Sequence, residues 1–142
     1  MKLPQAVETA FQALWQENFG DSFIVKEVRT LTGGSINTVR CVSNENASVC
    51  LKYNTAHYAL DLLQTEALGL QVLWESDSIR VPKCFGVSEL ESGGALLVME
   101  YLAPIATEQL RGLRTESYWT KFGRDLADLH SNTDAQFGLD HD

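Results

Sequence analysis

An acidic residue inside an apolar helical stripe constrains this sequence more than any other feature. Six apolar residues recur at helical spacing between residues 58 and 74: Ala59, Leu62, Leu63, Leu70, Leu73 and Trp74. Glu66 falls on that stripe, where a carboxylate is costly unless a cation meets it. The nearest candidate is Lys52, which closes a short apolar run 14 residues earlier. We therefore expect a strand carrying Lys52 to lie beside the helix that carries Glu66.

The run that contains Lys52 has the length and composition of a β-strand. Because strand side chains alternate between faces, Val49, Leu51 and Tyr53 should point one way and Cys50 and Lys52 the other. A lysine and a glutamate can also pair at the surface, where most ion pairs contribute little. The pair by itself therefore leaves a functional site and a surface ion pair as equal alternatives.

The other periodicities predict three strands, a helix, two strands, a linker and a helix, after an N-terminal helix. The expected elements are a helix over 4–18, strands over 23–32, 36–42 and 48–53, a helix over 58–74, strands over 84–90 and 95–101, and a helix over 116–130. Short turns between the strands predict antiparallel pairing. Five antiparallel strands with one packed helix form the α+β small lobe of protein kinases. We therefore expect a kinase-like N-terminal lobe over 1–102, a hinge over 103–114 and the start of a large lobe over 115–142.

Composition excludes several classes of protein. The 142 residues carry a net charge of −8, with a pI of about 4.8. This charge argues against binding to nucleic acid or to an anionic membrane, because both need a basic face. There is no apolar run long enough to span a bilayer, and the N-terminus has no secretory pattern. The odd set of Cys41, Cys50 and Cys84 has no zinc-like spacing, so we expect reduced thiols in a cytoplasmic protein.

A glycine turn joins the first two expected strands. Glycines allow backbone N–H groups to approach phosphates without a side chain in the way. A plain hairpin turn is the alternative, and the GxGxxG pattern of protein kinases is absent. The candidate phosphate-binding residues are Gly33, Gly34, Ser35, Ile36 and Asn37.

The end of the fifth expected strand is a second candidate for nucleotide contact. Met99, Glu100, Tyr101 and Leu102 precede the linker, where a kinase presents backbone groups to the edge of adenine. Cys50 shares a strand face with Lys52, at the position that lines adenine in kinases. The plain alternatives are a strand end and a small core residue.

The C-terminal segment offers two weaker patterns. His130 has no aspartate two residues later, so we expect a packed or capping histidine at the end of a helix rather than a catalytic loop. The last three residues are typical of a solvated chain end rather than of a metal site; they are Asp140, His141 and Asp142. We predict no metal ligands in this chain.

Several runs taken together resemble the fructosamine kinase (ketosamine-3-kinase) family. They are Leu31 to Asn37, Lys52 with Asn54, Glu66 to Leu70, Val81-Pro82, Leu97 to Leu102, Leu126 to His130 and Phe137 to Asp140. The resemblance implies ATP-dependent phosphoryl transfer to a hydroxyl of a sugar amine, on ketosamines or glycated proteins, and hence deglycation. It implies that Lys52 holds the α- and β-phosphates and that Glu66 orients Lys52. It also implies that residues 33–37 cover the phosphates, and that the Glu100 carbonyl and the Leu102 N–H contact adenine.

The same resemblance implies that the catalytic aspartate and the Mg²⁺ ligands belong to a large lobe beyond residue 142. We therefore expect that this chain alone is not a competent kinase. It would then be a truncated gene product, a fragment or half of a split enzyme. One alternative is a non-catalytic interaction module that binds a partner chain or self-associates through exposed apolar residues, namely Leu97, Met99, Trp119 and Phe122. Another is an aminoglycoside- or choline-kinase-like phosphotransferase.

Overall fold

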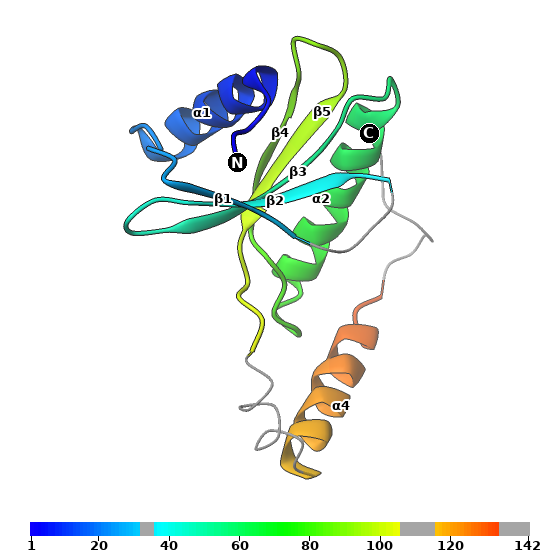
Figure 1. Ribbon diagram of the computed structural model, residues 1–142. Coiled ribbons are helices and arrows are strands. Elements are labelled where there is room, and N and C mark those ends of the chain that lie inside the picture. Colours follow the sequence, from blue (N-terminus) through cyan, green and yellow to red (C-terminus); the bar gives the residue numbers. More distant parts are fainter. Residues whose placement is uncertain (32–35, 106–115, 134–142) are drawn as a thin grey trace.

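The computed structural model describes residues 1–31, 36–105 and 116–133. A five-stranded antiparallel sheet in the order β1-β2-β3-β5-β4 has α1 packed on one face and α2 on the other (Figure 1). The elements in chain order are α1 (Gln5–Phe19), β1 (Glu27–Thr30), β2 (Thr38–Ser43), β3 (Ser48–Asn54), α2 (Ala59–Glu75), β4 (Cys84–Glu89), β5 (Ala95–Glu100) and α4 (Glu116–His130). The order of the elements agrees with the prediction, and α4 has the predicted bounds.

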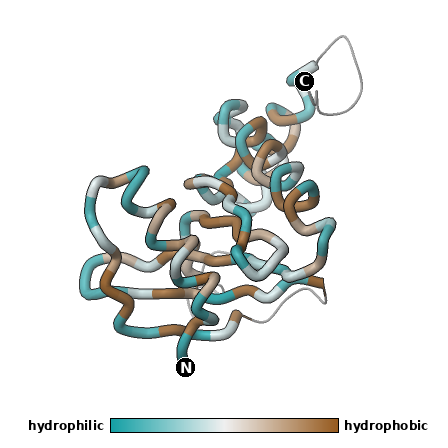
Figure 2. Tube along the Cα trace, turned by 90° about the horizontal axis from the view of Figure 1, so that it is seen from above, coloured by the Kyte–Doolittle hydropathy of each residue, from teal (hydrophilic) through white to brown (hydrophobic). Residues whose placement is uncertain are grey.

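The central strand β5 is buried on both faces, as its apolar run predicts. Leu96 and Val98 pack in the cluster under α1, whereas Leu97 and Met99 pack in the cluster under α2. Figure 2, seen from above, shows hydrophobic and hydrophilic residues alternating along the coiled parts of the chain. The sheet is therefore the middle layer of three.

The first strand is shorter than predicted, and Gln12 provides the reason. The predicted strand begins at residue 23, but β1 begins at Glu27. Phe23 instead packs edge-on against Phe11 of α1, with ring centroids 5.2 Å apart. The Gln12 side chain donates to the Phe23 carbonyl at 2.7 Å and accepts from the Phe23 N–H at 3.1 Å. Because these bonds satisfy the backbone of Phe23, this residue needs no strand partner.

The apolar stripe predicted for α2 is wrong at its edges. Ala59 and Leu63 are fully buried against the sheet, but Leu62 and Trp74 are 38% and 44% exposed. A helix that packs on one sheet face buries only the stripe that faces the sheet. The ring of Trp74 instead lies 5.5 Å from the guanidinium of Arg80.

Helix α4 lies apart from the sheet in Figure 1. Its apolar residues Trp119 and Phe122 are 57% and 41% exposed, as expected for an uncovered face. Leu97 and Met99, which were expected to share that exposure, are buried because α2 covers them. No helix in the described ranges has the length and apolar character needed to cross a membrane.

Candidate functional site

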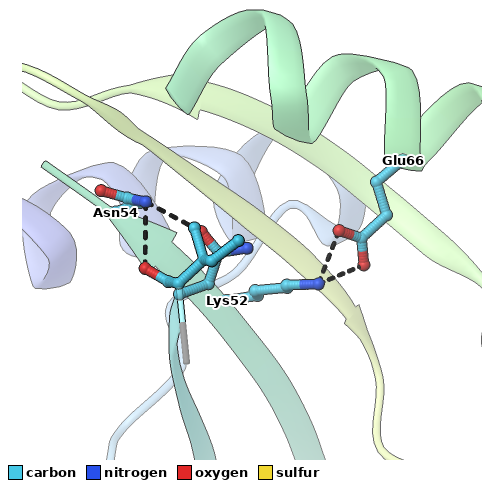
Figure 3. A network of polar contacts seen from close by, with 5 residues as sticks. Lys52, Asn54 and Glu66 are labelled. Atoms are coloured by element: carbon cyan, nitrogen blue, oxygen red, sulfur yellow. Dashed lines mark hydrogen bonds and ion pairs between the residues drawn. The ribbon is translucent and has the colours of Figure 1, made fainter. Parts of the chain in front are cut away.

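The structure brings Lys52 and Glu66 together, as the sequence predicts. The ammonium of Lys52 donates to both carboxylate oxygens of Glu66, at 2.7 and 2.6 Å (Figure 3). The two side chains are 23% and 32% exposed, so the pair lies at the boundary between the core and solvent. Such charge-assisted bonds fix the position of the ammonium group more firmly than a solvated lysine allows.

The strand and the helix that carry this pair are held by their neighbours. Leu51 belongs to the cluster under α1 and Cys50 packs against the cluster under α2, so Lys52 extends on the α2 face. On the helix, Leu63 is buried one turn before Glu66, and Leu70 packs one turn after it. The apolar contacts of α2 therefore hold the carboxylate over β3.

A row of sulfur-containing side chains crosses the sheet next to Lys52. Cys41 lies opposite Cys50, Cys50 lies opposite Met99, and Met99 lies opposite Cys84. Residues directly opposite one another share a face of the sheet. Burial raises the pKa of the Cys50 thiol to about 11 and also raises the pKa of Cys84, so both stay neutral at physiological pH. The row is thus apolar and polarisable, and its partly exposed member beside Lys52 is Cys50, a soft side chain that suits contact with an aromatic ring.

Glu100, the last residue of β5, is fixed by a residue that the sequence analysis missed. Arg80 donates to the Glu100 carboxylate, and the backbone N–H of Lys83 donates to the other carboxylate oxygen at 3.2 Å. The next residue, Tyr101, has its ring centroid 5.7 Å from the guanidinium of Arg29. Arg80 is 20 positions away from Glu100 in the chain, and no periodic pattern links them. Leu102, which follows, is 40% exposed and accessible to a ligand.

The predicted glycine turn is described only at its end. Gly33, Gly34 and Ser35 lie outside the described residues, as do residues 140–142. Ile36 is exposed and Asn37 half-buried, and both accept hydrogen bonds from the side chain of Asn54 at 3.1 Å. The sequence offered one signal for Asn54, because it follows Lys52 by two residues and so shares its strand face.

Among the described residues, neither a metal site nor the two cavities beside α2 extend this candidate site. Within residues 1–31, 36–105 and 116–133, no group of three or more His, Cys, Asp or Glu side chains could hold a metal ion. Two cavities, of about 520 and 600 Å³, lie beside α2 and share Trp74 and Glu75 in their walls. Neither is lined by Lys52 or Glu66. The candidate site therefore rests on the strand lysine, its carboxylate partner, Cys50 of the sulfur row and the end of β5.

Comparisons with known proteins point to one family. A sequence profile of the fructosamine kinase family matches residues 7–142. A protein named probable ketoamine kinase, from Synechocystis, is 34% identical over 142 residues, which cover 98% of this chain and 44% of the relative. The chain thus spans less than half the length of this relative.

Solved structures support the same fold. A crystal structure provisionally assigned as a fructosamine-3-kinase, from Haemophilus somnus, matches with a TM-score of 0.77 and 25% identity, over 92% of this chain and 41% of that one. Aminoglycoside phosphotransferase APH(4)-Ia, in a ternary complex with AMP-PNP and hygromycin B, matches with a TM-score of 0.56 and 11% identity, over 87% of this chain and 39% of that one. The second match shows the fold alone. The predicted kinase-like α+β architecture is confirmed.

Proposed function

This chain belongs to the fructosamine kinase family, and we propose that it is the ATP-binding part of a kinase that phosphorylates a hydroxyl of a sugar amine. The observation that carries the proposal is the Lys52–Glu66 pair. A lysine fixed by two short bonds to a helix carboxylate has its cation aimed at one place, where it can hold phosphate oxygens. The proposal assigns residues 1–102 to the ATP-binding lobe, 103–114 to the hinge and 115–142 to the start of the large lobe.

The described residues fit an adenine nucleotide in chemistry and in order. Lys52 supplies the cation for the phosphates, and Glu66 keeps that cation in place. Cys50, which is partly exposed, supplies an apolar side chain next to it for the base. Just before the proposed hinge, at the end of β5, Glu100 and Leu102 offer a backbone carbonyl and an N–H. Bound ATP would supply the γ-phosphoryl group, and this part of the chain would bind and orient it.

The proposed acceptor is a ketosamine, free or on a glycated protein, in keeping with the family and with the name of the Synechocystis relative. An aminoglycoside acceptor has only a similarity of fold behind it. Mg²⁺ binding, the lack of transfer activity in this chain alone, self-association through α4 and a cytoplasmic location stay predictions.

ATP-induced stabilisation of the folded chain tests the proposal. We expect ATP with Mg²⁺ to raise the melting temperature of the wild-type chain, since a ligand that binds only the folded state stabilises it. Lys52→Ala should remove most of the shift, and Glu66→Gln should reduce it, because the lysine loses its charged partner. Equal shifts in wild type and Lys52→Ala would refute the proposal.

Lys26→Ala is the matched control. Lys26 is another lysine with an acidic partner, Glu45 at 3.5 Å, but both side chains are more than half exposed and lie outside the candidate site. Its removal changes net charge by the same amount as Lys52→Ala. We expect Lys26→Ala to keep the full ATP-induced shift, which would exclude a general effect of charge on binding.

A further inference from the structure

Asn54, the last residue of β3, uses its whole side-chain amide in hydrogen bonds. Its Nδ2 group donates to the Ile36 carbonyl at 3.1 Å and to Oδ1 of Asn37 at 3.1 Å. Its Oδ1 atom accepts from the backbone N–H of Ala56 at 2.9 Å. The backbone partners fix the orientation of the amide, because the Ile36 carbonyl can only accept and the Ala56 N–H can only donate.

These bonds begin where the backbone pairing of β2 and β3 ends. The last registered pair at this end is Thr38 with Tyr53, so Asn37 and Asn54 are the next residues on each strand. There the side chain of Asn54 continues the connection that the strand ladder no longer makes. Figure 3 shows this network on the same strand as Lys52, with the Lys52–Glu66 pair beside it.

The backbone of Asn54 is itself held in place. Gly94, in the turn between β4 and β5, approaches so closely that a Cβ atom there would lie 2.0 Å from the Asn54 carbonyl oxygen and 2.5 Å from Cα of Thr55. Gly94 also has a φ of +88°, which favours glycine. The turn before β5 therefore fixes the backbone of Asn54. The hydrogen bonds of its side-chain amide in turn hold Ile36 and Asn37 relative to that backbone.

We propose that Asn54 is a positioning residue, which holds Ile36 and Asn37 in register with Lys52 so that phosphates bound by Lys52 meet a preset backbone. This inference rests on the proposed ATP-binding function. It adds a role that neither the Lys52–Glu66 pair nor the hinge performs, since Asn54 contacts neither of them through its side-chain bonds. Its effect should depend on the phosphates of the nucleotide rather than on the base.

The test compares the affinities of ATP and AMP for wild type and Asn54→Ala by isothermal titration calorimetry. Loss of two hydrogen bonds that order the phosphate side should weaken ATP binding about tenfold, whereas AMP binding should change less than about twofold. A variant that merely loosens the fold would weaken both nucleotides alike. An unchanged ratio of ATP to AMP affinity would overturn the inference.

The matched control is Asn44→Ala, at the opposite end of the same β2–β3 hairpin. Oδ1 of Asn44 accepts from the backbone N–H groups of Asn46 and Ala47, at 2.8 and 2.7 Å. Its loss removes the same kind of side-chain bond far from Lys52 and should leave the ATP-to-AMP ratio at its wild-type value. A ratio that falls equally in Asn44→Ala would also overturn the inference.

A second variant, Asn37→Ala, removes one partner and leaves the Asn54–Ala56 bond in place. It should weaken ATP binding by about threefold, and the double variant with Asn54→Ala should lose less than the product of the two single losses. Independent, multiplicative losses would contradict a shared network. If ATP binding is lost in Lys52→Ala but unchanged in Asn54→Ala, this inference is overturned and the proposed function stands. Wild-type chain that does not bind ATP would overturn the proposed function and this inference with it.

Discussion

The α1 face and the α2 face of the same sheet differ in what fills them. Under α1, large side chains such as Phe11, Phe23 and Leu51 are fully buried and contact one another. Under α2, the buried cluster is smaller, and the charged pair of Lys52 and Glu66 stands at its edge. One face is thus a closed apolar core, whereas the other keeps polar groups within reach of solvent.

This difference follows from the free energy of burying each kind of group. Apolar area removed from water stabilises a fold by about 25 cal/mol per Å². A partly buried ion pair offsets most of its Coulomb gain by desolvation. The α1 face therefore carries more of the stability, and the α2 face holds groups whose arrangement suits a ligand. Neighbouring residues on one strand, which point to opposite faces, allow a direct comparison.

The largest expected difference is between Leu51→Ala and Lys52→Ala. Leu51 is fully buried, so its truncation should lower the free energy of unfolding by about 2–5 kcal/mol. Lys52→Ala should change it by less than about 1 kcal/mol, because Glu66 is 32% exposed and can be solvated. Urea unfolding of both variants measures the contrast, and equal losses would show that the ion pair supports the fold as much as the core does.

A smaller effect is expected where α1 crosses β4. Gly86 has a φ of +141°, and a Cβ atom there would lie 3.1 Å from Cδ2 of Leu14. Gly86→Ala should therefore lower the free energy of unfolding by about 1–2 kcal/mol, through backbone strain and a tight contact.

Gly123→Ala, in α4, is the control with the opposite sign. A Cβ at Gly123 meets nothing within 4 Å, and alanine favours a helix by about 0.5–1 kcal/mol. Thermal unfolding should separate the two, and the same sign in both would contradict the packing described for Gly86.

The expected effect that is smallest near neutral pH concerns Cys50, on the α2 face, because it appears only as pH rises above 9. Burial raises its pKa from 9.0 to about 11, so the folded chain keeps the thiol proton over a range in which the unfolded chain loses it. The stability that this proton contributes is fully present below pH 9 and is lost as pH rises towards 11. Alkylation of Cys50 by iodoacetamide should accordingly be slow at pH 8 and accelerate towards pH 11. Reaction at the rate of a free thiol at pH 8 would show that the α2 face is more open than the structure indicates.

The amino-acid sequence by itself determined the order of the elements and the faces of their side chains. The alternation around Lys52 placed its side chain on the other face of the strand from Leu51. The helical spacing placed Glu66 in an apolar stripe, where its carboxylate needs a cation. The bounds of α4 also followed from periodicity. These features are local, because a strand or helix period is set by the backbone geometry of a few neighbouring residues.

Only the tertiary structure decided the contacts between distant segments. Gln12 bonds the backbone of Phe23 and so shortens the first strand. Arg80 fixes the carboxylate of Glu100 at the end of β5, and Asn54 reaches Ile36 and Asn37. The register that puts Cys41 opposite Cys50, and the stripe of α2 that faces the sheet, belong to the same class. Such contacts depend on how whole elements pack, and a one-residue shift in register would move every side chain to the other face. The site therefore combines a pair that local patterns predict with supports that only packing brings together.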